Sequence, residues 1–293
     1  MRASTSLATE LVWRCAAFQK WMNPRHAFSH ATAAALYGLP LPLYLERDRS
    51  LHVSSPMPLR PPQGRGISGH EVADALWDVR EIILRDVPTD QLFAFRIASP
   101  RLLWAQLAAI LDPDDVVALG DAIVTELPRP GLLDNPVLAS IGELRAVAAA
   151  HAGRRGAKAM SAAVDRIRVG PLSRPESLLR LIMLRAGLPE PELNVEVTDR
   201  AGRPVATPDF SWPAFRVVVE YEGDGHRTST AKFRSDITRG ERYADAEWFQ
   251  LRASADDVFR EPNNFVGRLS RRLTASGWHP PRRALRRVTP TRY

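Results

Sequence analysis

Two extended runs joined by a very short turn constrain this chain more than any other feature. The first run covers 203–210 and carries Asp209 near its end, and the second, 217–221, is rich in β-branched residues that favour strands. The Ser-Trp-Pro-Ala sequence between them is short enough for a hairpin, so we expect Asp209 to lie beside Glu220. Because side chains alternate along a strand, Glu220 and Glu222 share one face. The pattern therefore predicts three carboxylates at one end of a sheet.

Three crowded carboxylates repel one another, and a divalent cation is a common compensation. We predict that Asp209, Glu220 and Glu222 bind Mg²⁺ or Mn²⁺ through oxygen atoms. A cation there would acidify a bound water and neutralise charge on a phosphoryl transition state, so the predicted chemistry is phosphodiester hydrolysis. His226 follows a Gly-Asp-Gly turn and would deprotonate the water or donate to a phosphate oxygen. The alternatives are strand-end carboxylates facing solvent and an ordinary surface histidine.

The order and spacing of Asp209, Glu220, Glu222 and His226 resemble the core of the PD-(D/E)XK nucleases, in the branch of the very-short-patch repair endonucleases and the DUF559 proteins. The resemblance covers 173–260. It implies a restriction-endonuclease-like α/β domain with a mixed central sheet, and metal-dependent cleavage of DNA. The chain departs from the family pattern at the motif lysine, whose place Glu222 takes. The lysines of the chain are Lys20, Lys158 and Lys232.

Glu176 is a further candidate for the catalytic site. It lies at the start of a predicted helix, and many PD-(D/E)XK nucleases carry a glutamate in the helix before the sheet, so the resemblance implies that Glu176 adds a carboxylate. Ser173 and Glu176 also have the spacing of a capping box, which would explain Glu176 without any chemistry. Both interpretations remain open from the sequence.

Three basic residues near the predicted site are candidates for binding nucleic acid. Lys232 and Arg239 lie on the charged face of a predicted helix at 229–245, and Arg252 lies on the predicted last strand. A cation here would pair with a substrate phosphate or with a site carboxylate. The alternative is a solvated helix with ion pairs between successive turns.

The segment 28–42 predicts a short alanine-rich helix. Ser29 is a good N-cap, alanines are strong helix formers, and Gly38 followed by Pro40 ends the helix. The segment resembles the AbiEi-type antitoxin domain of bacterial toxin–antitoxin systems. That resemblance implies a winged-helix region and a cognate toxin as partner. Strand-like pieces beside it predict a small β layer, at 51–55, 69–72 and 81–84.

Composition and charge limit the class of protein. The chain is 45% hydrophobic and 25% charged, which is typical of globular proteins. Its single cysteine, Cys15, excludes an internal disulfide and favours a cytoplasmic protein. No apolar run approaches the roughly 18 residues of a membrane helix, so we expect neither a span nor a signal peptide. The net charge of +7 is concentrated in 268–293, which holds eight arginines and no acid. We expect this tail to be disordered, and either to bind phosphates or to aid solubility.

These observations predict an α+β chain with a mostly helical, winged-helix-like N-terminal domain and a restriction-endonuclease-like α/β C-terminal domain. The predicted parts are an antitoxin-like domain at 1–130, a helical linker at 131–170, a nuclease domain at 171–267 and a basic tail at 268–293. The predicted function is metal-dependent hydrolysis of DNA, in a toxin–antitoxin or phage-defence context. The alternative is a non-catalytic DNA-binding or regulatory protein built on a degenerate nuclease fold. Besides DNA, the predicted partners are a cognate toxin or a second copy of the chain.

Overall fold

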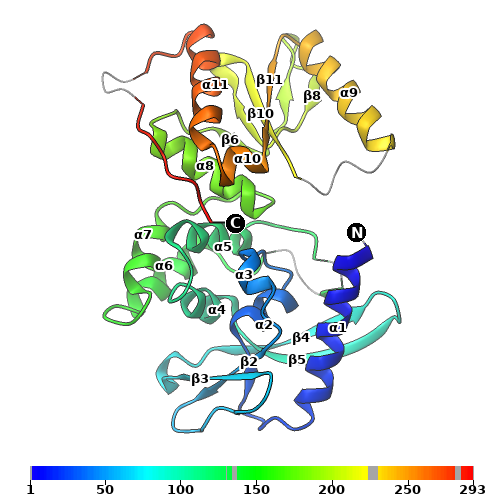
Figure 1. Ribbon diagram of the computed structural model, residues 1–293, viewed down its shortest axis with the longest axis vertical. Helices are drawn as coiled ribbons and strands as arrows, with labels where there is room; N and C mark the ends of the chain where they lie inside the picture. The colour runs from blue at the N-terminus through cyan, green and yellow to red at the C-terminus, as the bar shows by residue number, and fades with distance from the viewer. Residues whose placement is uncertain (1, 130, 134–136, 224–229, 281–284, 293) are drawn as a thin grey trace. The chain divides into compact units, whose positions relative to one another are not determined.

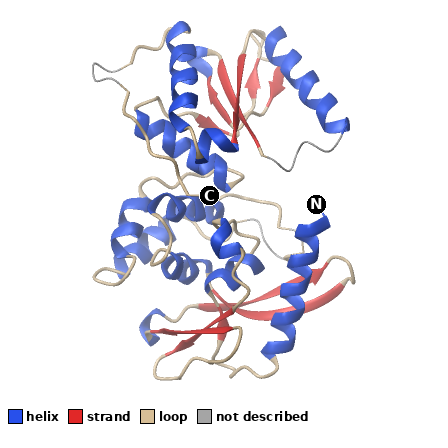
Figure 2. Cartoon of the chain, in the orientation of Figure 1, coloured by secondary structure: helices blue, strands red, loops and turns tan. Residues whose placement is uncertain are grey.

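The computed structural model describes residues 2–129, 131–133, 137–223, 230–280 and 285–292, without the side chains of 2–8 and 230–237. The chain is a mixed α/β protein that divides into two compact units, Met1–Val169 (unit 1) and Gly170–Tyr293 (unit 2). Helices cover the strands in each unit (Figure 2). None of the described helices combines the length and the apolar character that crossing a membrane requires.

Unit 1 is rich in helices and contains one sheet. Its helices are α1 (Arg2–Gln19), α2 (His30–Leu36), α3 (Leu43–Glu46), η1 (Asp74–Leu76), α4 (Pro100–Leu107), α5 (Pro113–Val124), α6 (Ile141–Ala150) and α7 (Ala157–Val164). Its strands are β1 (Ala27–Phe28), β2 (Leu51–Pro56), β3 (Ile67–Val72), β4 (Val79–Asp86) and β5 (Gln91–Ala98).

The sheet of unit 1 is larger than the small β layer that the sequence predicts. It is a mixed five-stranded sheet in the order β3-β2-β1-β5-β4. The sequence prediction misses β5, although Phe95 and Ile97 alternate with exposed Ala94 and Arg96 as a half-buried strand requires. β5 pairs with β4 as an antiparallel hairpin and with β1 in parallel, and α1 packs against it (Figure 1). β2 and β3 are parallel neighbours at the other side of β1.

The segment predicted as a helical linker, 131–170, belongs to unit 1 as far as Val169, and Gly170 begins unit 2. Its two helices, α6 and α7, pack on each other and on α4 and α5. These contacts help to bury α5, whose residues from Asp114 to Val124 are all buried. The side chain of Asp121 is fully buried and accepts the backbone N–H of Arg168 at 2.7 Å.

Unit 2 is built from helices on both faces of a sheet. Its helices are α8 (Arg174–Ala186), η2 (Pro213–Phe215), α9 (Thr230–Asp245), α10 (Ala255–Phe259) and α11 (Pro262–Ala275). Its strands are β6 (Glu192–Leu193), β7 (Val197–Thr198), β8 (Pro204–Ala206), β9 (Phe210–Trp212), β10 (Val217–Glu222) and β11 (Phe249–Ser254). β7 and β8 form a separate antiparallel pair, and the other four strands form the main sheet.

The main sheet of unit 2 is mixed, with the strand order β11-β10-β9-β6. β10 is parallel to β11 and antiparallel to β9, and β9 is antiparallel to β6. Alternation along β10 sends Val217 and Val219 into a core with α8, α10 and α11, and sends Val218 into a second core with Tyr243 of α9. Figure 1 shows α11 and α9 on opposite sides of these strands. Glu220, by the same alternation, lies on the α9 face.

The basic tail at 268–293 is folded where it is described, which corrects the prediction of a disordered arm. Its first part completes α11, and Trp278 and Val288 are buried in the main core of unit 2. Asn263 of α11 exchanges two hydrogen bonds with the backbone of Val288, at 2.9 and 3.0 Å, and the N–H of Arg286 donates to the carbonyl of Ala186. The apolar residues among the arginines therefore anchor this segment to α8 and α11.

Candidate functional site

The predicted hairpin forms and brings Asp209 beside Glu220. β9 and β10 pair with Phe210 opposite Val219, which sets Asp209, the residue just before β9, next to Glu220. The backbone N–H of Tyr221 donates to Asp209 Oδ2 at 2.7 Å and fixes the carboxylate against β10. The hairpin differs in one detail from the prediction. The run at 203–210 is broken after β8, which pairs with β7, so the arm that carries Asp209 is short.

Helix α9 supplies two donors to Glu220. The guanidinium of Arg239 donates to Glu220 Oε2 at 2.9 Å, and the hydroxyl of Tyr243 donates to Glu220 Oε1 at 2.9 Å. Arg239 and Tyr243 are four residues apart and therefore lie on one face of the helix. Burial and the Glu220 charge raise the pKa of Tyr243, which keeps its phenol protonated as a donor. Arg239 thus pairs with a site carboxylate, one of the two roles that the sequence left open.

Glu176 is buried, and its carboxylate accepts hydrogen bonds at the start of α8. Its Oε1 accepts the hydroxyl of Ser173 at 2.7 Å, and its Oε2 accepts the N–H of Leu172 at 2.8 Å and the side-chain amide of Asn194 at 3.3 Å. The N–H of Glu176 returns a bond to Ser173 Oγ at 3.4 Å, so the predicted capping interaction is present. Burial raises the pKa of Glu176 despite these donors.

Electrostatics couple Glu176, Asp209 and Glu220, which we call the acidic cluster. Burial first, and then the charges of Glu176 and Glu220, raise the pKa of Asp209 to about 7 against the opposing effects of the Tyr221 N–H and Arg239. The site therefore disfavours the ionised form of Asp209, first by burial and then by the neighbouring negative charges. A bound cation would offset both effects and favour the carboxylate.

The acidic cluster fits Mg²⁺ as a site of two carboxylates. Mg²⁺ is usually held by one or two carboxylates, with waters and phosphate oxygens completing its shell. Asp209 and Glu220 are adjacent and belong to this donor class. The oxygens of Glu220 also accept from Arg239 and Tyr243, and those of Glu176 accept in the cap, so a cation would share these carboxylates with their donors. In the part of the chain that the structure describes, three histidines of unit 1 form a group whose ligand atoms all lie within 4.8 Å of one another. The carboxylates of the acidic cluster do not form such a group.

Among the other predicted site residues that the structure describes, Glu222 and Arg252 pair with each other. Glu222 lies on β10 and forms an ion pair with Arg252 of β11 at 2.7 Å, with both side chains about half exposed. His226 lies outside the described residues, and the side chain of Lys232 does as well. Sequence reasoning missed Tyr243 and Asn194. The signal for Tyr243 was its spacing of four residues from Arg239 on a predicted helix.

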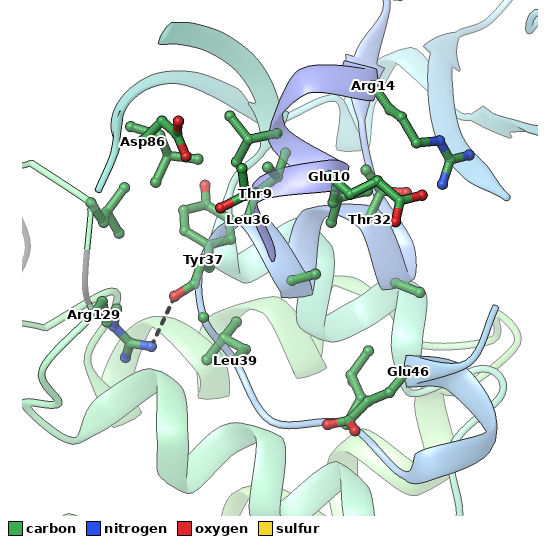
Figure 3. Close-up of a pocket in the computed structure, with 18 of the residues that line it drawn as sticks. Thr9, Glu10, Arg14, Thr32, Leu36, Tyr37, Leu39, Glu46, Asp86 and Arg129 are labelled. Atoms are coloured by element: carbon green, nitrogen blue, oxygen red, sulfur yellow. Dashed lines mark hydrogen bonds between the residues drawn. The ribbon is translucent and has the colours of Figure 1, made fainter. Parts of the chain in front are cut away.

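A cavity of about 700 Å³ in unit 1 lies among α1, α2 and the end of β4 (Figure 3). Its wall includes Tyr37 and the buried Arg129, whose guanidinium donates to the carbonyls of Tyr37 at 3.2 Å and Ala122 at 2.7 Å. Burial, followed by the charge of Arg80, lowers the pKa of Arg129 to about 10. The Tyr37 carbonyl lies at the end of α2, and the Ala122 carbonyl lies in the last turn of α5. Arg129 therefore connects the two helices.

Comparison with known proteins gives relatives but no family. No model of a known protein family and no solved structure matches the chain. Two proteins of Mycobacterium tuberculosis, the uncharacterized proteins MT2308 of strain CDC 1551 and Rv2248 of strain H37Rv, are each 32% identical to this chain over 131 residues. The match covers 45% of this chain and 48% of either relative, so the chain spans about half the length of the curated relatives it matches.

Proposed function

We propose that unit 2 is a metal-dependent nuclease domain that hydrolyses DNA phosphodiester bonds. The observation that carries the proposal is the pairing of Asp209 with Glu220 at the end of the β9–β10 hairpin, with the buried charge of Glu176 acting on Asp209. A mixed sheet that follows a helix with a buried glutamate is also what the resemblance to the PD-(D/E)XK nucleases leads us to expect. The proposed arrangement is therefore of the restriction-endonuclease type.

In this proposal each residue of the acidic cluster has a separate role. Asp209 and Glu220 would ligate Mg²⁺ or Mn²⁺, which when bound supplies an acidified water and neutralises charge on the phosphoryl group. Glu176 holds the start of α8 and keeps the site negative. Tyr243 and Arg239 fix the orientation of the Glu220 carboxylate. His226 remains the proposed base for the attacking water.

The proposed DNA contacts come from the cations near the cluster. Arg239 keeps 37% of its side chain exposed while paired with Glu220, so it can meet a phosphate without leaving the site. Arg252 is paired with Glu222 on the surface and would have to exchange that partner for a phosphate. Lys232 lies on the same helix as Arg239 and stays a proposed phosphate contact.

The test is cleavage of supercoiled DNA by the full chain with Mg²⁺ or Mn²⁺. We expect the wild type to nick the DNA and Asp209→Asn to lower the rate by at least about 10³-fold, because the neutral amide cannot replace the carboxylate as a ligand. Asn can still accept the Tyr221 N–H, so the hairpin should persist. Glu192→Gln on β6 is the matched control, because it removes an exposed carboxylate from the same sheet. Equal rates for the wild type and Asp209→Asn would refute the proposal.

A non-catalytic DNA-binding role is the second candidate, and two observations favour it. Glu222 takes the place of the motif lysine and is paired with Arg252, and Arg239 already neutralises Glu220. A wild type that shifts DNA on a gel but leaves it uncut with either metal would select this function. Arg239→Gln should then weaken DNA binding, whereas Glu192→Gln should not.

For unit 1 we propose an antitoxin-like role with a cognate toxin or a second copy of the chain as partner. The support is α2, in which Ala31, Ala33 and Ala34 are buried, as the short helix of such a domain requires. The winged-helix arrangement is part of this proposal. Light scattering after size exclusion tests the homodimer directly, since a mass of one chain at all concentrations would exclude it.

A further inference from the structure

Three histidines from separate elements of unit 1 lie together, and we call them the histidine cluster: His30, His52 and His70. His30 is the first residue of α2, and His52 and His70 lie on the parallel neighbours β2 and β3. One ring nitrogen of each lies within 4.8 Å of the others. The imidazole rings are stacked, with His30 and His70 centroids 3.7 Å apart and those of His52 and His70 5.1 Å apart.

Hydrogen bonds fix the ring of His52 from the outside. Its Nε2 lies 2.9 Å from Asp48 Oδ2, and because an ionised carboxylate only accepts, Nε2 carries the proton. Its Nδ1 therefore presents a lone pair, 2.9 Å from His70 Nε2. A carboxylate that holds the far nitrogen of a histidine is the usual support of a metal-ligating imidazole. Asp48 is itself held by the N–H of Ser50 at 2.8 Å.

The surroundings of His30 and His70 disfavour the charged form of both imidazoles. Burial and the neighbouring imidazoles lower the pKa of His30 to about 2, and burial and His52 lower that of His70 to about 4. A metal binds an imidazole nitrogen that carries no hydrogen, so metal binding here would replace the hydrogen bond between His52 Nδ1 and His70 Nε2. The backbone of His30 is left-handed, with φ 47°, which is unusual for a residue with a side chain. Backbone strain of this kind persists at ligand sites that the surrounding fold imposes.

We propose that His30, His52 and His70 bind one divalent transition-metal ion, with Zn²⁺ as the expected occupant and Asp48 as the residue that orients His52. Imidazole nitrogens favour such ions over Mg²⁺. Zinc–nitrogen bonds of about 2.0–2.1 Å in tetrahedral geometry place two ligand nitrogens about 3.3 Å apart. The nitrogens of the cluster, 2.9 Å apart at one pair and all within 4.8 Å, bracket this separation. The stacked rings would have to turn so that their lone pairs converge on the ion.

The fourth coordination position would be open to a small molecule. His30 and His70 line a cavity of about 590 Å³, whose wall also includes His151, Arg154 and Arg155. Three protein ligands with a fourth position open to water or substrate define the reactive class of zinc sites. The two arginines in the wall favour an anion as the additional ligand.

The experiment is a titration of the chelator-treated full chain with Zn²⁺ by calorimetry and with Co²⁺ by visible absorption. We expect one ion per chain and the absorption of tetrahedral Co²⁺. His70→Gln and His52→Ala should each weaken binding at least about 100-fold, and Asp48→Asn about 10- to 100-fold. His279→Ala is the control, because His279 is exposed on unit 2. Asp209→Asn should bind Zn²⁺ normally, which separates this site from the acidic cluster.

Circular dichroism of each variant decides whether a loss of binding reflects the ligand or the fold. His70 is only partly buried, so His70→Gln tests the proposal even where His52→Ala unfolds. Loss of the Co²⁺ absorption in a folded His70→Gln supports the site. Absence of binding by the wild type, or equal binding by folded His70→Gln, overturns the proposal.

Discussion

The acidic cluster of unit 2 and the histidine cluster of unit 1 both crowd ionisable groups of one kind, but they relieve the crowding differently. Burial and neighbouring charges raise the pKa of Asp209, and Glu220 pairs with the cation Arg239. The pKa values of His30 and His70 are instead lowered, which favours their neutral imidazoles. The first solution leaves oxygen ligands for a hard cation, and the second leaves nitrogen lone pairs for a transition metal. The chain thus offers two chemically different sites, and each prediction below tests whether they act separately.

The largest expected effect on stability concerns Asp209 in the metal-free protein. Its folded pKa of about 7 exceeds the usual value near 3.9, so the folded state binds a proton that the unfolded state releases between those values. Its contribution to stability is therefore present below about pH 4 and is lost as pH rises through about 7. We therefore compare the free energy of unfolding of Asp209→Asn with that of the wild type at two pH values. Between pH 4 and pH 8 this difference should shift in favour of the variant by a few kcal/mol.

Urea unfolding of both proteins with chelator present, at a series of pH values, measures this difference. Glu192→Gln should follow the wild-type curve at each pH. A difference between Asp209→Asn and the wild type that stays constant from pH 4 to pH 8 would show that Asp209 titrates normally.

Zinc should stabilise unit 1 through the histidine cluster. An ion that binds only the folded state adds about 2.7 kcal/mol at a concentration 100 times its Kd. We expect this gain in the wild type and in Asp209→Asn, and we expect its loss in His70→Gln. Thermal unfolding with and without Zn²⁺ measures the gain. A Zn²⁺ effect that disappears in Asp209→Asn would place the ion at the acidic cluster instead.

Tyr243→Phe should cost about 2 kcal/mol. The variant keeps the buried ring but removes the hydroxyl that donates to Glu220 Oε1, and hydrogen bonds to charged groups contribute about 1.5–3 kcal/mol. Chemical denaturation measures the cost. When Tyr243→Phe is made in the Glu220→Gln variant, the loss of stability should be smaller, because the acceptor is no longer charged. Equal costs in both backgrounds would mean that the hydroxyl does not act through Glu220.

The smallest effect is expected at Glu222. Its ion pair with Arg252 is half exposed, and exposed pairs contribute about 1 kcal/mol or less. Glu222→Gln should therefore change stability by less than about 0.5 kcal/mol, as measured by urea denaturation. A cleavage rate that falls as far as in Asp209→Asn would show that Glu222 is a metal ligand as well.

The acidic cluster could be predicted in part because local sequence determines it. A β-branched run, a short turn and strand alternation suffice to place Asp209 beside Glu220, and the capping spacing places Glu176 at the start of α8. Tyr243 reaches Glu220 only through the packing of α9, which local sequence does not specify. The ion pair that turns Glu222 toward Arg252 likewise depends on the parallel neighbour β11.

The histidine cluster and the fold of the tail are set by contacts between distant segments. His30, His52 and His70 meet because β2 lies between β1 and β3, an order that adjacent residues do not reveal. The tail appeared disordered from its arginines, but Val288 and Trp278 decide its path by entering the core. The helices α6 and α7 were predictable as helices, whereas their packing on α5 depends on how completely α5 is buried.

The most direct test of the account is the nicking rate of supercoiled DNA in Mn²⁺ for three full-length proteins: the wild type, Asp209→Asn and His70→Gln. The account predicts that Asp209→Asn loses activity by about 10³-fold or more and that folded His70→Gln cuts like the wild type. Loss of cleavage in His70→Gln with full activity in Asp209→Asn would contradict the assignment of the acidic cluster as the nuclease site.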